Sequence, residues 1–188
     1  MSKCVLVILS LLVGLSTSSF GQSAPSSESN PAEAAFQSAV ARYLDLHRRL
    51  KSEVPPLTVS ADPAEITRIS DTLAVAVQRA RQNARRGDIF NDQIAQVITI
   101  RLREQLADVD IDKFLVAITD EPTLTDRPAI HKRYPVASSM ATTPTRVLAV
   151  LPPLPEVLEY RFIGRSLILR DRDAALIVDY IADVLPAR

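Results

Sequence analysis

The sequence predicts a mainly α-helical protein with a small C-terminal antiparallel β-meander, an α+β fold in which helices and strands are segregated along the chain. Between residues 31 and 107, apolar side chains recur every three or four positions, which is the spacing of one helix face. Between residues 158 and 181, apolar and polar side chains alternate in short runs separated by turn-forming residues, which is typical of paired strands. Because so small a sheet needs helices to cover one face, we expect a single domain over residues 31–186.

The first 21 residues have the features of a secretory signal peptide. Lys3 supplies a positive charge, residues 5–15 form an apolar run, and the small residues Ser19 and Gly21 suit cleavage after Gly21. The apolar run is too short to span a bilayer and no later run is longer, so we expect no membrane span in the mature chain. Residues 22–30 lack large apolar side chains and are expected to form a flexible leader.

Cysteine content and net charge exclude several classes of protein. Cleavage would remove Cys4, the only cysteine, and a cysteine-free mature chain has no disulfide, cysteine nucleophile or zinc–thiolate site. Lys+Arg and Asp+Glu number 22 each, so no global positive field attracts nucleic acid. We therefore expect a periplasmic or secreted bacterial protein that binds no nucleic acid.

Three helices are expected in the first part of the mature chain. An asparagine followed by proline suits the start of a helix over residues 31–53, and the prolines that follow would end it. A similar start predicts a second helix over about 63–86, with Gly87 as its left-handed cap, and a third is expected over about 91–107. The first two should form an antiparallel helical hairpin, with the third helix covering its open side.

The strands are expected over about 158–181. Gly164 suits the first central position of a type II′ turn, which predicts a tight hairpin between the first two strands. A second turn near Asp171 leads into an apolar run that ends at Ile181. Leu151–Pro155 is expected to be a stiff strap that positions the meander against the helices. Residues 108–146 give weak signals for any element.

Several short segments carry a family resemblance. They are Ala84–Phe90 (ARRGDIF), Leu151–Pro155 (LPPLP), Leu158–Arg165 (LEYRFIGR), Leu167–Asp171 (LILRD) and Leu176–Ile181 (LIVDYI). Together they resemble the pattern of a family of uncharacterised secreted bacterial proteins, which implies export and this architecture but no activity. The C-terminal meander is also similar to the Tyr-rich meander ending in Ile-Val-Asp of the periplasmic nickel/cobalt-homeostasis regulator family, although the His-rich segments of a metal handler are missing.

The chain offers few candidates for catalysis. His47 and His131 are the only histidines, and His47 lies on the apolar face of the first helix, where we expect a packed, hydrogen-bonded side chain rather than a ligand or base. The role of His131 stays open. There is no His-Glu-x-x-His, no Gly-x-Ser-x-Gly and no glycine-rich phosphate loop, so no catalytic residue or cofactor is assigned.

One acidic string resembles the start of a calcium loop. Asp108, Asp110 and Asp112 alternate as in an EF-hand, but Lys113 occupies the position of the required Gly, and Thr119 that of the bidentate Glu. We expect a polar boundary after the third helix and assign no metal.

Four arginines near the end of the second helix are the candidate contact for an anion or a partner: Arg79, Arg81, Arg85 and Arg86. Positive charge there complements the helix dipole, which is a sufficient structural explanation. Arginines also bind phosphate and carboxylate groups, so an anionic envelope component stays an alternative.

These observations lead to an expected function. We expect an exported, non-catalytic cell-envelope protein that binds an unidentified partner or helps maintain the envelope. The alternatives are a periplasmic metal-handling protein and a hydrolase with an unrecognised site.

Overall fold

The computed structural model describes residues 30–54, 63–118, 127–134 and 143–186. Its helices are α1 (Pro31–Glu53), α2 (Pro63–Ala80), α3 (Asp92–Gln105), α4 (Ile111–Ile118) and α5 (Thr145–Leu148), and its strands are β1 (Leu158–Ile163), β2 (Ser166–Asp171) and β3 (Leu176–Ile181). The strands form an antiparallel sheet in the order β1-β2-β3. This is the segregated α+β arrangement that the sequence predicts. The expected signal peptide, residues 1–21, lies outside the described residues, as do residues 22–29 of the expected leader.

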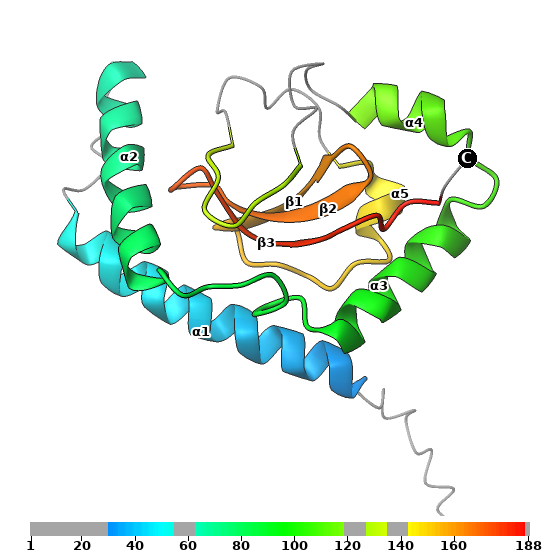
Figure 1. Ribbon diagram of the computed structural model, residues 1–188, viewed down its shortest axis with the longest axis horizontal. Coiled ribbons are helices and arrows are strands. Elements are labelled where there is room, and N and C mark those ends of the chain that lie inside the picture. The colour runs from blue at the N-terminus through cyan, green and yellow to red at the C-terminus, as the bar shows by residue number, and fades with distance from the viewer. Residues whose placement is uncertain (1–29, 55–62, 119–126, 135–142, 187–188) are drawn as a thin grey trace, which may run out of the picture.

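Helices α1, α2 and α3 lie around the sheet on three sides (Figure 1). In Figure 1, α1 runs along the sheet, and α2 and α3 rise from α1 at opposite ends of the sheet. The α1–α2 hairpin is present as predicted. However, α3 contacts α1 and α5, and in Figure 1 the sheet lies between α2 and α3. The prediction that α3 covers the open side of the hairpin is therefore wrong, because the apolar sheet face packs there instead. Among the described residues, no helix combines the length and apolar character that crossing a membrane requires.

Asparagine caps start two of the helices. The side-chain oxygen of Asn30 accepts a hydrogen bond from the backbone N–H of Ala32 at 3.0 Å, and that of Asn91 accepts one from Ile94 at 3.0 Å. These bonds satisfy N–H groups that have no partner within the helix. The bounds of α1 and α3 accordingly agree with the expected 31–53 and about 91–107.

The second helix is shorter than expected. It ends at Ala80 rather than near Arg86, and Gly87, with φ +93°, lies within the loop that follows instead of capping the helix. A long-range interaction fixes this loop, because Asp179 of β3 accepts hydrogen bonds from the backbone N–H groups of Gly87, Ile89 and Phe90. Residues 81–91 join α2 to α3, and we call them the 81–91 loop.

The β1–β2 hairpin has the predicted turn. Ile163 pairs with Ser166, which leaves Gly164 and Arg165 as a two-residue turn. Gly164 has φ +53° whereas Arg165 is not among the positive-φ residues, as a type II′ turn requires.

A β-bulge changes the direction of side chains on β3. Asp179 pairs with Leu169 and Ile177 with Arg170, so Val178 is an extra residue on its strand. Val178 is buried in the core on the helix side, and Asp179 reaches the 81–91 loop from the same side.

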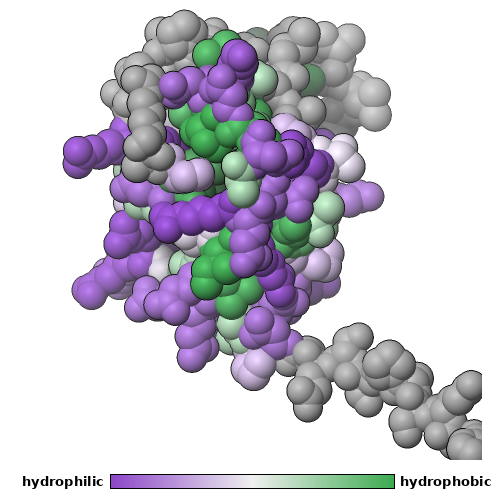
Figure 2. Space-filling view, turned by 90° about the vertical axis from the view of Figure 1, so that its right-hand side faces the viewer, coloured by the Kyte–Doolittle hydropathy of each residue, from purple (hydrophilic) through white to green (hydrophobic). Residues whose placement is uncertain are grey.

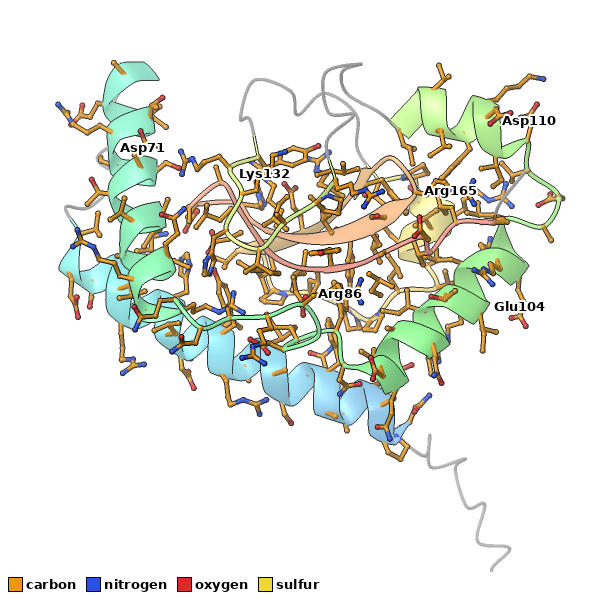
Figure 3. The ribbon with its side chains drawn as sticks, in the orientation of Figure 1. Asp71, Arg86, Glu104, Asp110, Lys132 and Arg165 are labelled. Carbon is orange, nitrogen blue, oxygen red and sulfur yellow. The ribbon has the colours of Figure 1, made fainter. Side chains whose placement is uncertain are left out.

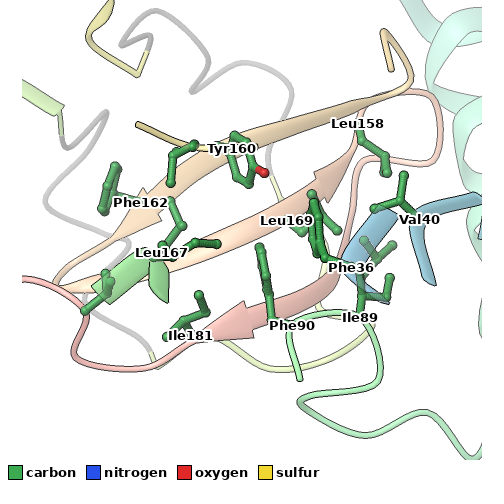
Figure 4. Close-up of a cluster of buried hydrophobic side chains, with 14 of the residues drawn as sticks. Phe36, Val40, Ile89, Phe90, Leu158, Tyr160, Phe162, Leu167, Leu169 and Ile181 are labelled. Atoms are coloured by element: carbon green, nitrogen blue, oxygen red, sulfur yellow. The ribbon is translucent and has the colours of Figure 1, made fainter. Parts of the chain in front are cut away.

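The main core lies between α1 and the sheet. The rings of Phe36 and Phe90 stack with centroids 5.5 Å apart, and Phe90 stacks on Tyr160 at 6.3 Å (Figure 4). Smaller packing on the other sheet face involves Ile168 and Tyr134, whose segment pairs with β3 through backbone hydrogen bonds.

The proline-rich strap is fixed at both of its sides. The hydroxyl of Tyr160 donates to the carbonyl oxygen of Pro152 at 2.9 Å, and the amide of Gln37 donates to that of Pro153 at 3.0 Å. The strap therefore joins β1 to α1, as the sequence suggests.

Candidate functional site

A buried polar network connects α1 to the end of β2. One carboxylate oxygen of Asp171 accepts the hydroxyl of Tyr43 at 2.6 Å and lies 2.7 Å from Nδ1 of His47. Its other oxygen accepts the backbone N–H of Ala174 at 2.8 Å. Tyr43, His47 and Asp171 are all buried. Since Tyr43 and His47 lie one turn apart on α1, both reach the same carboxylate.

The network continues to the surface through Asp173. Its carboxylate lies 3.3 Å from Nε2 of His47 and 2.5 Å from Nζ of Lys51. Burial alone would lower the pKa of His47, but the hydrogen bonds to Asp171 and Asp173 outweigh it and raise the pKa to about 9. The bond from His47 lowers the pKa of Asp173 to about 2 against the effect of burial. At neutral pH His47 is therefore an imidazolium that donates from both nitrogens, in agreement with the packed, hydrogen-bonded histidine that the sequence predicts.

Lys51 and Asp173 open onto a polar cavity of about 460 Å³, which we call the charged cavity. It lies between the C-terminal end of α1, the segment before β1, and the first two strands. Its lining residues are Lys51, Glu156, Val157, Glu159, Arg161, Arg170, Arg172 and Asp173.

Two arginines hold one glutamate in the wall of the charged cavity. Arg161 donates to Glu159 at 3.0 Å, and Arg170 of the neighbouring strand donates to the other oxygen of the same carboxylate. Burial would raise the pKa of Glu159, but the bonds and charges of Arg161 and Arg170 lower it below its usual range. The carboxylate is thus ionised, and this Arg161–Glu159–Arg170 triad carries a net charge of +1.

Arg170 has one further contact and one unused donor. Its guanidinium lies 4.9 Å from the ring centroid of Tyr134. Its Nε is buried and bonds to none of the described residues. The group therefore keeps a donor for an additional acceptor.

A second cavity of about 520 Å³, the apolar cavity, lies between β1 and the proline-rich strap. It is lined by Thr143, Leu148, Leu151, Pro152, Pro153, Leu154, Leu158, Glu159, Tyr160 and Arg161. Glu159 and Arg161 line both cavities, so their side chains form a shared wall. We call the two cavities together the β1 site.

The four predicted arginines have different neighbours. Arg79 is exposed and lines a groove between α1 and α2. Arg81 donates to the carbonyl oxygen of Val178 at 3.1 Å, and its guanidinium lies 5.2 Å from the ring centroid of Tyr43.

The remaining two, like Arg81, belong to the 81–91 loop. Arg85 is exposed, and the guanidinium of Arg86 lies 5.8 Å from the ring centroid of Tyr180 (Figure 3). Only Arg79 lies in the last turn of α2, so the dipole explanation covers that residue alone. A partner contact by these arginines stays a prediction.

The acidic string and His131 have structural contacts. The carboxylate of Asp110 accepts the backbone N–H groups of Asp112 and Lys113 at 3.1 and 3.2 Å and so caps α4 (Figure 3). Asp108 pairs with Arg146 at 3.1 Å. The backbone of His131 bonds to that of Ile177 in β3, and burial lowers the pKa of its imidazole.

In the part of the chain that the structure describes, metal ligands and exposed apolar side chains give no second candidate site. Within the described ranges, no group of three or more His, Cys, Asp or Glu side chains is arranged to hold a metal ion. The face seen in Figure 2 is largely hydrophilic with separate apolar patches. Scattered apolar side chains of this kind are common on soluble proteins.

Sequence reasoning did not identify the residues of the β1 site, although a signal was present. Glu159 and Arg161 interrupt an otherwise apolar strand and share one sheet face. The register imposed by the two-residue turn then places Arg170 opposite Glu159. A cross-strand cluster of charges was therefore derivable from the predicted hairpin.

The fold and the β1 site define an α+β protein with a two-part cavity along an edge strand. No protein-family model, no curated protein and no solved structure shows significant similarity to the chain.

Proposed function

We propose that the protein is an exported, non-catalytic binding module of the bacterial cell envelope, and that the β1 site is where it binds. The observation that carries the proposal is the shared wall of Glu159 and Arg161 between a charged and an apolar cavity. Binding pockets typically combine an apolar surface with a few fixed polar groups, and their volumes fall in the range of these two cavities.

The hydrogen bonds and the raised pKa of the buried titratable groups support binding rather than acid–base catalysis. His47 is buried and bonded at both nitrogens, and the carboxylate of Asp171 is bonded at both oxygens. A general base needs a free acceptor near neutral pH, whereas the pKa of His47 is raised to about 9. These groups are used to join α1 to the sheet.

Export is supported by the signal-like N-terminus and by the resemblance to secreted bacterial proteins. Mass spectrometry of the protein from its native host should find an N-terminus near Gln22. An intact Met1 in a cytoplasmic fraction would contradict export.

The binding proposal is tested by affinity capture from envelope extract with immobilised signal-free protein. Arg172→Glu reverses a charge at the charged cavity, and it suits the test because Arg172 is exposed and its side chain makes one bond, to the carbonyl oxygen of Glu156 at 3.2 Å. Arg103→Glu, on the exposed side of α3, is the matched control. We expect a component that wild type and the Arg103 variant retain and the Arg172 variant loses.

Equal retention by all three proteins, or by none, would contradict the proposal. Circular dichroism of the variants checks that each keeps its secondary structure.

A further inference from the structure

We propose that a small cavity between α1 and the 81–91 loop binds a free α-amino acid with an apolar side chain. The inference goes beyond the proposed function and is independent of it, because no residue of this cavity lines the β1 site. The loop runs along the side of α1 in Figure 1, and the cavity between them has a volume of about 210 Å³. That is the space of about seven water molecules at roughly 30 Å³ each, which suits a ligand of amino-acid size.

The cavity has an apolar floor that α1 and the loop provide together. Ala39, Tyr43 and Leu46 line it from one face of α1, at the three- and four-residue spacing of a helix, and Ile89 lines it from the loop. The hydroxyl of Tyr43 is already bonded to Asp171, so the floor offers mainly carbon. An alkyl side chain placed there would lose contact with water, which favours a ligand with an apolar side chain.

Charged groups of both signs lie around this floor. Arg42 of α1 and Arg81 and Asp88 of the loop line the same cavity. Among the described residues, none of the three forms an ion pair. An anion alone would leave Asp88 facing like charge, and an amine alone would meet two guanidinium groups. A ligand with a carboxylate and an ammonium group can pair with all three side chains.

Arg81 is held in place before a ligand binds. Its Nη1 donates to the carbonyl oxygen of Val178 at 3.1 Å, and its guanidinium lies 5.2 Å from the ring centroid of Tyr43. Its other N–H groups bond to none of the described residues. A planar guanidinium matches the two oxygens of a carboxylate, and one that is already oriented loses little freedom when it binds.

Asp88 is oriented by its own loop. One of its carboxylate oxygens accepts the backbone N–H of Arg85 at 2.9 Å, and its other oxygen has no hydrogen bond from the described residues. The N–H groups of Gly87 and Ile89, on either side of Asp88, bond to Asp179 and fix this part of the loop. The second oxygen is therefore an acceptor for an ammonium group. An α-amino acid carries its carboxylate, its ammonium group and its side chain on one carbon, as a cavity of this size requires.

NMR titration of isotope-labelled, signal-free protein with leucine at neutral pH tests the ligand class. Three probes each lack one part of leucine: isocaproate lacks the ammonium group, isoamylamine lacks the carboxylate, and glycine lacks the side chain. We expect leucine to shift the amide signals of Arg42 and of the 81–91 loop. Isocaproate and isoamylamine should bind roughly two- to five-fold more weakly, as expected for the loss of an exposed charge pair, and glycine about ten-fold or more.

Two variants locate the charged groups of the ligand. Arg42→Gln should weaken binding of leucine and isocaproate by roughly two- to five-fold and should not weaken binding of isoamylamine. Asp88→Asn can still accept the N–H of Arg85, and it should weaken leucine and isoamylamine but not isocaproate. Arg49→Gln is the matched control, because Arg49 is exposed on α1 two turns away, forms no ion pair with the described residues and lines none of the cavities described above. Thermal unfolding of each variant separates loss of binding from loss of folding.

Several results would overturn the inference. They are leucine that binds no more tightly than isocaproate and isoamylamine, shifted signals that lie away from α1 and the 81–91 loop, and no binding by any of the four probes. Equal effects of Arg42→Gln on isocaproate and isoamylamine would overturn the placement of the charged groups. None of these results bears on Arg172-dependent capture from envelope extract, so failure of this site and failure of the proposed function are distinguishable.

Discussion

Replacing His47 with Gln should remove a pH-dependent part of the protein's stability. His47 is 1% exposed and lies between the carboxylates of Asp171 and Asp173, to which it is bound as an imidazolium. Glutamine can still donate a hydrogen bond but carries no charge and does not titrate. The comparison therefore isolates the charge of His47.

The direction and size follow from the two pKa values of His47. Its pKa is about 9 in the folded protein, against about 6.5 in the unfolded chain. Since the folded value is the higher, the stabilisation is fully present below about pH 6.5 and is lost as the pH rises through 9. At about 1.4 kcal/mol per pKa unit, the difference between the two pKa values corresponds to about 3 kcal/mol of folding free energy.

The assay is urea unfolding followed by far-UV circular dichroism between pH 6 and pH 9.5. The free energy of unfolding of the wild type should fall by about 3 kcal/mol relative to His47→Gln across this range. His131→Gln is the control, because burial lowers the pKa of His131, and a group with a lowered pKa does not lose its contribution to stability as the pH rises through 9. Parallel pH profiles for wild type and His47→Gln would refute the reasoning.

Three further predictions concern the fold and the arginines. Asp179→Ala should lower the free energy of unfolding in urea by about 3 kcal/mol or more, because three backbone N–H groups of the 81–91 loop lose their acceptor. Asp179→Asn should lower it by less, and equal losses in the two variants would contradict this. Gly164→Val should lower the free energy of unfolding by about 1 to 3 kcal/mol, and Gly164→Asn by less. No atom lies within 4 Å of an added Cβ, so the loss would come from backbone strain alone. An unchanged thermal midpoint in the valine variant would rule out the positive-φ turn. The double variant Arg79→Glu, Arg85→Glu should change stability by no more than about 1 kcal/mol and leave co-sedimentation with envelope fragments unchanged, whereas salt-sensitive binding that the variant abolishes would make these arginines a partner contact.

Local sequence signals predicted those elements whose stabilising contacts are themselves local. The cap of α1 joins Asn30 to Ala32, and the type II′ turn needs only Gly164 at its first central position. In both cases residues a few positions apart decide the conformation, so composition and spacing are sufficient.

Long-range contacts account for what the sequence pattern missed. The loop that follows α2 depends on Asp179, which lies about ninety residues after the N–H groups that it accepts. In the sequence, His47 is one polar residue on the apolar face of a helix. Its charged state depends on Asp171 and Asp173, which lie at a turn more than 120 residues later. No periodicity in α1 or α2 contains that information.

The polar groups of the three strands separate into two roles, and this separation makes the binding proposals testable. Asp171 at the end of β2 and Asp179 on β3 point to the helix side, where their carboxylates hold α1 and the 81–91 loop. Variants at these two positions should therefore destabilise the protein whatever it binds.

Glu159 and Arg161 lie on the edge strand β1 and form none of those attachments to the helices. Paired charges that are this buried are commonly no more stabilising than apolar residues of similar volume, so stability alone is a weak reason for their presence. Their place in the wall that the two cavities share is better explained by a role in binding.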